Sequence, residues 1–439
     1  MSELPADPAT SAAESMSDDT DQGGIISQPP GVPSHNLFPN LDGYRAIAAM
    51  MVVVTHVAFQ TKYIYAGPVG AVLSRFDFGV TLFFLISGFL LYRPWARAGI
   101  ARGSRPAVKP YLTRRFARIF PAYLLVLVAV LLILPSTRAV ASEAGQWKAW
   151  LTHLTFTQAY FHEGFITGLT QMWSLGTEVM FYLALPVIGW LAARKKTGAD
   201  SYRRQFRLLM LLILIGIAGT AIRAFLSFDT PPLMGFWLPA YIDWFAIGML
   251  FALLWEARSA GIPSRIEPWL QKAAADPWVP VVAGALVLLL AATPLTGPYD
   301  LSPSTTLQTF ARHFLYAVAA ALFLIPAVAG NQGQGSWRVF LQTPGMRFLG
   351  EISYGIFLWH LFVMETLYWA LGLKEFTGQF WLILPPVVIG TIVMGWLSWV
   401  VVERPSIAWS HRVTRNPKPS APQPPPGSGR QSPTSVGSR

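Results

Sequence analysis

The sequence predicts an all-α membrane protein, a polytopic bundle of about ten transmembrane helices with both termini in the cytoplasm. Three observations predict this fold class. Only 13% of the residues are charged and 53% are hydrophobic, whereas a soluble domain has about 25% charged residues. Apolar runs of the length that crosses a bilayer, about 20 residues, recur along the chain. Basic residues cluster in every second connection between these runs, as in multi-pass proteins.

The apolar runs predict ten spans, and the basic residues predict their orientation. With the N-terminus in the cytoplasm, 26 of the 33 Lys and Arg residues fall in segments on the cytoplasmic side. The connections "RPWARAGIARGSRPAVKPYLTRRFAR" and "RKKTGADSYRRQFR" carry most of them. The net charge of +11 is therefore interpreted as topology in the cell (plasma or inner) membrane, and not as nucleic-acid binding. The predicted spans are 46–64, 78–95, 119–135, 173–193, 208–226, 239–255, 278–293, 311–329, 348–370 and 381–402.

Composition also predicts the domain organisation. Residues 1–40 are rich in Ser, Asp, Pro and Gly, and residues 407–439 are basic and rich in Pro and Ser. Both are predicted to be disordered tails, which leaves 41–406 as a single transmembrane domain. The chain has no cysteine, which excludes disulfides, thiolate metal sites and a Cys nucleophile. With only seven histidines, neither a metal site nor a permanently bound cofactor is expected.

The first span carries two ionisable residues within "GYRAIAAMMVVVTHVAF". Arg45 and His56 are eleven residues apart, which is close to three turns, so they share one helix face about 16 Å apart along the axis. Arg45 alone fits an interfacial, snorkelling residue, and His56 alone fits a buried hydrogen-bonding residue. Ionisable groups at membrane depth usually face a polar cavity, and histidine is well suited to proton transfer. His56 is therefore a candidate catalytic base.

Two further sets of polar residues suggest chemistry. Arg115 and Arg118 are three residues apart at the start of the third span, where paired guanidiniums can hold phosphates; plain topology signalling is the alternative. Glu178 lies five residues into the fourth span, at a depth similar to that of His56. It is a candidate either to hold the second nitrogen of the His56 imidazole or to bind an acceptor hydroxyl. A helix N-terminal acid, with Ser174 as the cap, is the structural alternative. Arg223 and Asp243 are candidates for an intramembrane ion pair.

Several segments resemble, in order, the acyltransferase 3 family of membrane-bound acyltransferases. "LDGYRAIAAMMVVVTHVAF" has the family's Arg, ten residues and His. "YLTRRFARIFPAYLLVL" has its Arg-x-x-Arg, and "QMWSLGTEVMFYLALPV" has its Trp-Ser-Leu-x-x-Glu. "FGVTLFFLISGFLLYRPW", "YIDWFAIGMLFALL", "GEISYGIFLWHLFV" and "VVERP" complete a resemblance that covers about residues 40 to 406.

The resemblance implies a membrane O-acyltransferase that takes a short acyl group from cytoplasmic acyl-CoA, with acetyl-CoA expected as the donor. The acceptor would be a hydroxyl of an envelope glycan, a lipid or a secreted metabolite. His56, Arg45 and Glu178 would be catalytic, with His56 as a general base or a transient acyl carrier. Arg115, Arg118, Trp173 and Ser174 would bind substrate. His360, in the segment "GEISYGIFLWHLFV", is interpreted as a structural hydrogen-bonding residue and not as a second base.

A polytopic secondary transporter is the alternative function, because buried charges in ten spans also suit a carrier. Such carriers often have inverted repeats with interrupted spans at matching positions. No internal symmetry of this kind is visible in the sequence, so the enzyme is favoured.

Overall fold

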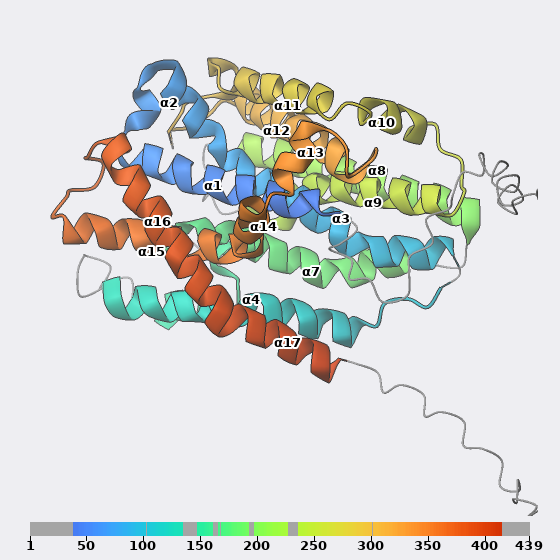
Figure 1. Ribbon diagram of the computed structural model, residues 1–439, viewed down its shortest axis with the longest axis horizontal. Helices are drawn as coiled ribbons and strands as arrows, with labels where there is room; N and C mark the ends of the chain where they lie inside the picture. Colours follow the sequence, from blue (N-terminus) through green and yellow to red (C-terminus); the bar gives the residue numbers. More distant parts are fainter. Residues whose placement is uncertain are drawn as a thin grey trace, which may run out of the picture.

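The computed structural model describes residues 38–101, 103–134, 147–160, 166, 168–192, 197–226, 236–300 and 302–414. This part of the chain is built from helices and turns and contains no β-strand. Figure 1 shows most of the long helices lying roughly along one direction, as expected for a membrane bundle. The long helices are α1 (Asn40–Gln60), α3 (Gly79–Ile100), α4 (Val108–Ile133), α7 (Trp173–Ala192), α8 (Gly198–Leu226), α9 (Ile242–Ser259), α11 (Trp278–Ala291), α12 (Thr306–Val328), α15 (Ser353–Ala370) and α16 (Phe380–Ser398).

Shorter helices connect and flank the long ones. They are α2 (Gly67–Ser74), α6 (Trp147–Leu154), α10 (Glu267–Ala273), α13 (Ser336–Leu341), α14 (Pro344–Glu351) and α17 (Arg404–Val413). A 3-10 turn, η3 (Arg75–Phe78), leads into α3, and a π-helical turn (Trp399–Glu403) joins α16 to α17. The remaining 3-10 turns are η2 (Tyr63–Tyr65), η5 (Gln158–Tyr160), η6 (Thr170–Met172), η8 (Leu238–Ala240) and η9 (Pro294–Thr296).

The structure confirms the all-α polytopic class. Each of the ten predicted spans overlaps one long helix. Among the described residues, seven helical stretches are long and apolar enough to cross a membrane, or eight if α10 and α11, bent by 89°, form one broken span. The helices α9 and α15 are not among them; α9 carries three charged residues, and α15 carries His360 and Glu365. The span count of ten and the cytoplasmic termini stay predictions.

The ends of several helices differ from the sequence prediction. The helix α4 begins at Val108, eleven residues before the predicted third span, so Arg115 and Arg118 lie inside it and not at its start. Long basic side chains permit this, because their apolar stems can lie along a helix while the charged group reaches a polar region. The helix α17 runs to Val413, past residue 406, whereas residues 415–439 of the predicted C-terminal tail and residues 1–37 lie outside the described residues.

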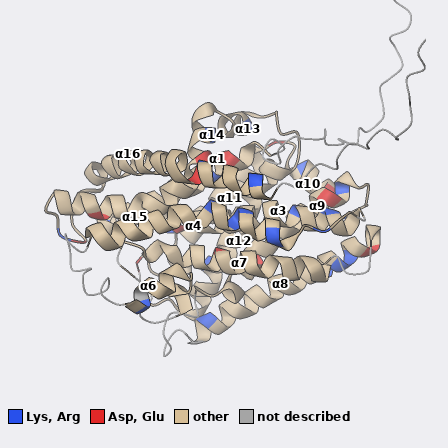
Figure 2. Cartoon of the chain, turned by 90° about the horizontal axis from the view of Figure 1, so that it is seen from below, with Lys and Arg blue, Asp and Glu red and all other residues tan. Residues whose placement is uncertain are grey.

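Charge separates the two ends of the bundle. Figure 2 shows Lys and Arg residues gathered where α3 and α9 end and α8 begins, which we call the basic end. The ring of Phe38, just before α1, contacts Phe89 of α3 and Trp255 of α9, so α1 also begins there. This arrangement agrees with the predicted accumulation of basic residues on one side of the membrane.

Close packing between α3 and α9 sets the centre of the bundle. A Cβ atom added at Gly88 would lie 2.1 Å from the carbonyl oxygen of Phe245, and one added at Gly248 would lie 2.0 Å from that of Leu85. The two backbones can approach this closely only because neither glycine has a side chain. The helix α1 packs against α3, α14 and α15, and His56 faces α15.

The outer surface of α8 indicates contact with lipid. Leu211, Leu214, Ile217, Ile222 and Phe225 are all exposed, although they lie in an apolar helix. In water, such a continuous exposed apolar face would be unfavourable. In a bilayer, these side chains contact lipid tails that are as apolar as they are.

Candidate functional site

Two histidines from distant parts of the chain meet at the interface of α1 and α15. The ring centroids of His56 and His360 are 4.9 Å apart, with an angle of 59° between the ring planes. His56 is half-buried, and His360 is 1% exposed. The structure therefore places His56 against another helix inside the bundle. It also places His360, interpreted from the sequence as structural, beside the candidate base.

Hydrogen bonds define which ring nitrogens carry a proton in the neutral form. His56 Nδ1 lies 2.7 Å from the carbonyl oxygen of Val52, and His360 Nδ1 lies 2.7 Å from that of Phe357. A carbonyl oxygen only accepts, so each Nδ1 must donate, and each Nε2 then carries a lone pair. Within the described residues, His360 Nε2 is buried and has no hydrogen-bond partner. The pair thus offers two imidazole nitrogens able to accept a proton.

A carboxylate that the sequence analysis did not single out lies near His56. The segment that enters α3 runs beside α1: Thr55 Oγ1 donates to the carbonyl oxygen of Ser74 at 3.3 Å, and Gly79 contacts Ala48. Asp77 lies between these two contacts and interacts electrostatically with His56. The hydroxyl of Tyr316 donates to Asp77 Oδ1 and so helps to position it. An acidic residue directly before a span was the available signal, but no spacing rule connects it to α1.

Three arginines from α1 and α4 form a second group nearer the basic end. We call Arg45, Arg115 and Arg118 the arginine cluster. Arg45 is 21% exposed, binds Asp42 at 3.3 Å, and interacts electrostatically with Arg118. Arg115 also interacts with Arg118. The structure therefore brings together three of the residues that the sequence analysis assigned to catalysis or substrate binding.

Carboxylates and tyrosines partly offset this positive charge. Glu178 interacts electrostatically with Arg45 and Arg115, and the buried Glu403, at the π-helical turn, interacts with Arg118. The buried Nε of Arg115 nevertheless has no hydrogen-bond acceptor within the described residues. A donor left without a partner is costly when buried. The cluster therefore has the character of an anion site whose ligand would supply the missing acceptor.

The position of Glu178 corrects one interpretation of the sequence. Its Oε1 accepts hydrogen bonds from Ser87 Oγ at 2.5 Å and from the Tyr182 hydroxyl at 2.7 Å. Among the described residues, no hydrogen bond joins it to His56, whose Nδ1 already donates to Val52. Depth along a helix predicts the level of a residue but not the direction of its side chain. Glu178 is thus bonded to Ser87 of α3 and to Tyr182, and it interacts electrostatically with Arg45 and Arg115 instead of bonding to the imidazole.

Trp173 and Ser174 have structural partners at the start of α7. The Trp173 ring lies 4.9 Å from the Phe236 ring and 5.3 Å from the Tyr241 ring. Ser174 is 4% exposed, and its hydroxyl donates to the carbonyl oxygen of Gln171 at 3.2 Å. The side-chain amide of Gln171 in turn donates to the carbonyl oxygen of Leu358, which brings this turn beside the helix of His360. The predicted role of Trp173 and Ser174 in substrate binding stays a prediction.

The prediction of an ion pair between Arg223 and Asp243 is wrong. Asp243 Oδ2 lies 2.7 Å from His313 Nε2, and Arg223 donates to the hydroxyl of Tyr241 at 2.7 Å. The aspartate lies in the first turn of α9 and faces α12, whereas the arginine lies near the end of α8. Helix order along the chain did not reveal α12 as the neighbour of Asp243.

Comparison with known proteins shows what this chain is similar to. The family model described as "Acyltransferase domain" matches residues 38–402. Nodulation protein 10 of Rhizobium leguminosarum bv. viciae is 26% identical over 402 residues, covering 84% of this chain and 93% of that protein. Acyltransferase MdmB of Streptomyces mycarofaciens is 27% identical over 408 residues, covering 88% and 95%.

A longer relative shares only part of its length with this chain. O-acetyltransferase OatA of Staphylococcus aureus (strain NCTC 8325 / PS 47) is 23% identical over 351 residues. The match covers 77% of this chain and 53% of that protein, so the chain spans about half of that relative's length. No solved structure matches the chain.

Proposed function

The chain belongs to the acyltransferase 3 family, and on that premise we propose that it transfers a short acyl group from cytoplasmic acyl-CoA to a hydroxyl across the membrane. It is a multi-pass membrane acyltransferase. The family and the names of its relatives favour this enzyme over a transporter, and the name "O-acetyltransferase" favours acetyl-CoA as the donor. The acceptor would be an envelope glycan, a lipid or a secreted metabolite at the cell membrane.

The arginine cluster would bind the donor. Acyl-CoA carries a pyrophosphate and a ribose phosphate, and guanidinium groups bind phosphate oxygens in pairs. The unpartnered Nε of Arg115 supports this assignment, because a phosphate would supply its acceptor. Arg45 links this site to the histidine pair, since it shares a face of α1 with His56 about 16 Å away along the axis. The pantetheine arm would follow that face to bring the thioester to the imidazole.

His56 Nε2 would move the proton of the acceptor. In direct transfer it accepts the proton of the hydroxyl group while the hydroxyl oxygen attacks the thioester carbonyl. The carbon–sulfur bond breaks, and the leaving thiolate takes the proton, so the products are an ester and free CoA thiol. If His56 is instead an acyl carrier, Nε2 first takes the acyl group, and CoA leaves before the acceptor attacks. Both routes need the lone pair on Nε2. The hydrogen bond from Nδ1 to Val52 keeps the proton on Nδ1 and leaves this lone pair available, and that observation carries the proposal.

Radiolabelled acetyl-CoA and purified protein in lipid nanodiscs test this mechanism. We expect His56→Ala to bind acetyl-CoA normally and to lose transfer to the native acceptor fraction. Label that remains on the denatured wild-type protein with donor alone, and is absent from His56→Ala, would identify the carrier route; its absence from both would identify direct transfer. Normal transfer by a correctly folded His56→Ala protein would rule out both routes.

A further inference from the structure

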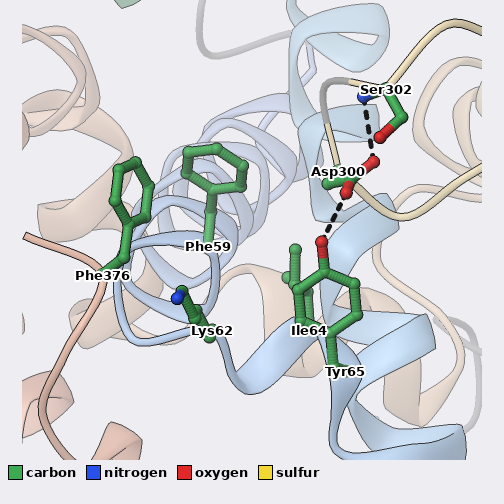
Figure 3. Close-up of a pocket in the computed structure, with 7 residues that line it drawn as sticks. All are labelled: Phe59, Lys62, Ile64, Tyr65, Asp300, Ser302 and Phe376. Carbon is green, nitrogen blue, oxygen red and sulfur yellow. Dashed lines mark hydrogen bonds between the residues drawn. The ribbon is translucent and has the colours of Figure 1, made fainter.

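A pocket of about 390 Å³ opens at the end of the bundle opposite the basic end. Its volume lies in the range typical of small-ligand sites. Figure 3 shows two phenylalanine rings and a lysine on one side and a tyrosine, an aspartate and a serine on the other. The lining residues are Phe59, Lys62, Ile64, Tyr65, Asp300, Ser302 and Phe376.

Both helices of the histidine pair lead into this pocket. Phe59 follows His56 by three residues on α1, a rise of about 4.5 Å. Phe376 lies in the connection that follows α15, the helix of His360. The rings of Phe59 and Phe376 pack edge to face, with centroids 5.6 Å apart. The pocket thus lies beyond the histidines along both elements.

The polar side of the pocket offers a fixed acceptor and a free donor. The Tyr65 hydroxyl donates to Asp300, and the backbone N–H of Ser302 donates to Asp300 Oδ1 at 2.9 Å. These bonds, that of Tyr65 first, lower the pKa of Asp300 to about 2, so this carboxylate is charged at neutral pH. Lys62 is exposed, and no ion pair involves it within the described residues. Each carboxylate oxygen still has a lone pair for a ligand.

Backbone strain is concentrated at this pocket. Among the described non-glycine residues, only Lys62, Phe156 and Phe376 have positive φ, at 58°, 57° and 57°. A bulky residue such as phenylalanine rarely adopts this conformation. Two of the three strained residues therefore line the pocket. Such strain tends to occur at ligand sites, where it holds side chains in a required direction.

We propose that this pocket binds a sugar unit of the acceptor and presents one of its hydroxyls to the histidine pair. This inference rests on the proposed function. A sugar ring has apolar C–H faces that pack on aromatic rings and several hydroxyls that both donate and accept. The phenylalanine pair matches the faces, and Asp300 and Lys62 match the hydroxyls. An acyl chain of a lipid would leave the ammonium and the carboxylate without partners, so a carbohydrate fits these walls better.

Blocking the pocket chemically tests the proposal, because the chain has no native cysteine. Lys62→Cys places a single thiol in the pocket. Leu371→Cys is the matched control, since Leu371 is 55% exposed just after α15 and is outside the pocket lining. Cells carrying either variant are treated with a bulky, membrane-impermeant maleimide. Newly formed acetyl esters are then measured separately in the carbohydrate and lipid fractions, and acetyl-CoA binding is measured on the purified, labelled protein.

Relative to the wild-type protein treated in the same way, we expect labelled Lys62→Cys to show carbohydrate esterification lowered by about tenfold or more, and labelled Leu371→Cys to differ by less than about twofold. Acetyl-CoA binding should stay unchanged in both. Unchanged esterification after complete labelling of Lys62→Cys, or esters found only in the lipid fraction, would overturn the proposal. A wild-type protein that neither binds acetyl-CoA nor forms esters would instead overturn the proposed function.

A second variant covers the case in which Lys62→Cys does not fold. Asp300→Asn keeps the size of the side chain but removes its charge. We expect it to lower carbohydrate esterification by about tenfold with unchanged acetyl-CoA binding, because a hydrogen bond to a charged group is lost. Esterification equal to that of the wild-type protein would overturn the role of this pocket.

Discussion

The two ends of α1 contain ionisable groups that are stabilised in different ways. Near the basic end, Arg45 belongs to a cluster of guanidiniums offset by Glu178 and Glu403. Farther along, His56 faces another imidazole, and its Nδ1 bonds to its own helix backbone. A guanidinium stays charged in proteins and needs counter-charges when buried, whereas an imidazole can be neutral. One region is therefore built to hold an anion, and the other to move a proton.

Replacing His56 should have the largest effect. We expect His56→Ala to lower kcat by about 10²- to 10⁴-fold, the usual contribution of a general base. The Kd for acetyl-CoA should change by less than about twofold, because the arginine cluster is intact. Steady-state transfer kinetics and equilibrium binding measure the two quantities. An equal loss of binding and turnover would mean that the two regions do not act separately.

Replacing Arg115 should give the opposite pattern. We expect Arg115→Ala to raise KM for acetyl-CoA by about 10- to 100-fold with a smaller change in kcat, because a charge-assisted bond to phosphate is worth about 1.5 to 3 kcal/mol. Arg114→Ala is the matched control: Arg114 is the preceding residue, and its Nε donates to Thr414 Oγ1 at 2.9 Å. A similar rise in KM for both variants would indicate a general effect of charge on α4.

Replacing His360 distinguishes a second base from a packing residue. We expect His360→Gln to lower kcat by about tenfold while KM for acetyl-CoA stays the same, because the buried imidazole faces His56 and not the arginine cluster. If His360 shares the proton that His56 accepts, the pH profile of kcat should also lose one inflection in this variant. A lower thermal stability with an unchanged pH profile would instead assign it a structural role.

The smallest effect is expected at Tyr65 in the outer pocket. Tyr65→Phe removes the main donor to Asp300, so the pKa of Asp300 should rise from about 2 toward its ordinary value. In the wild-type protein, the Asp300 carboxylate therefore keeps its charge below its ordinary pKa. In the Tyr65→Phe variant, it loses that charge as the pH falls toward the ordinary value. Carbohydrate esterification should therefore change by less than about twofold at neutral pH, and the ratio of variant to wild-type activity should decline toward pH 4. A ratio that is constant over this range would argue against a role for the Asp300 charge.

The sequence by itself determined the helices and the local relations along each of them. Apolar runs of spanning length predict helices because a bilayer leaves no other partner for the backbone, and each of the ten runs overlaps a long helix. The shared face of Arg45 and His56 follows from the helical repeat alone. These properties are local, so one segment contains all the information that they need.

Only the tertiary structure decided which side chains meet across helices. It placed His360 and Asp77 beside His56, and it turned Glu178 toward Ser87 and the arginine cluster. Pairing and rotation of helices depend on close contacts such as those at Gly88 and Gly248, between segments far apart in the chain. A helical repeat predicts the face on which a residue lies, but the partner of that face is set by packing.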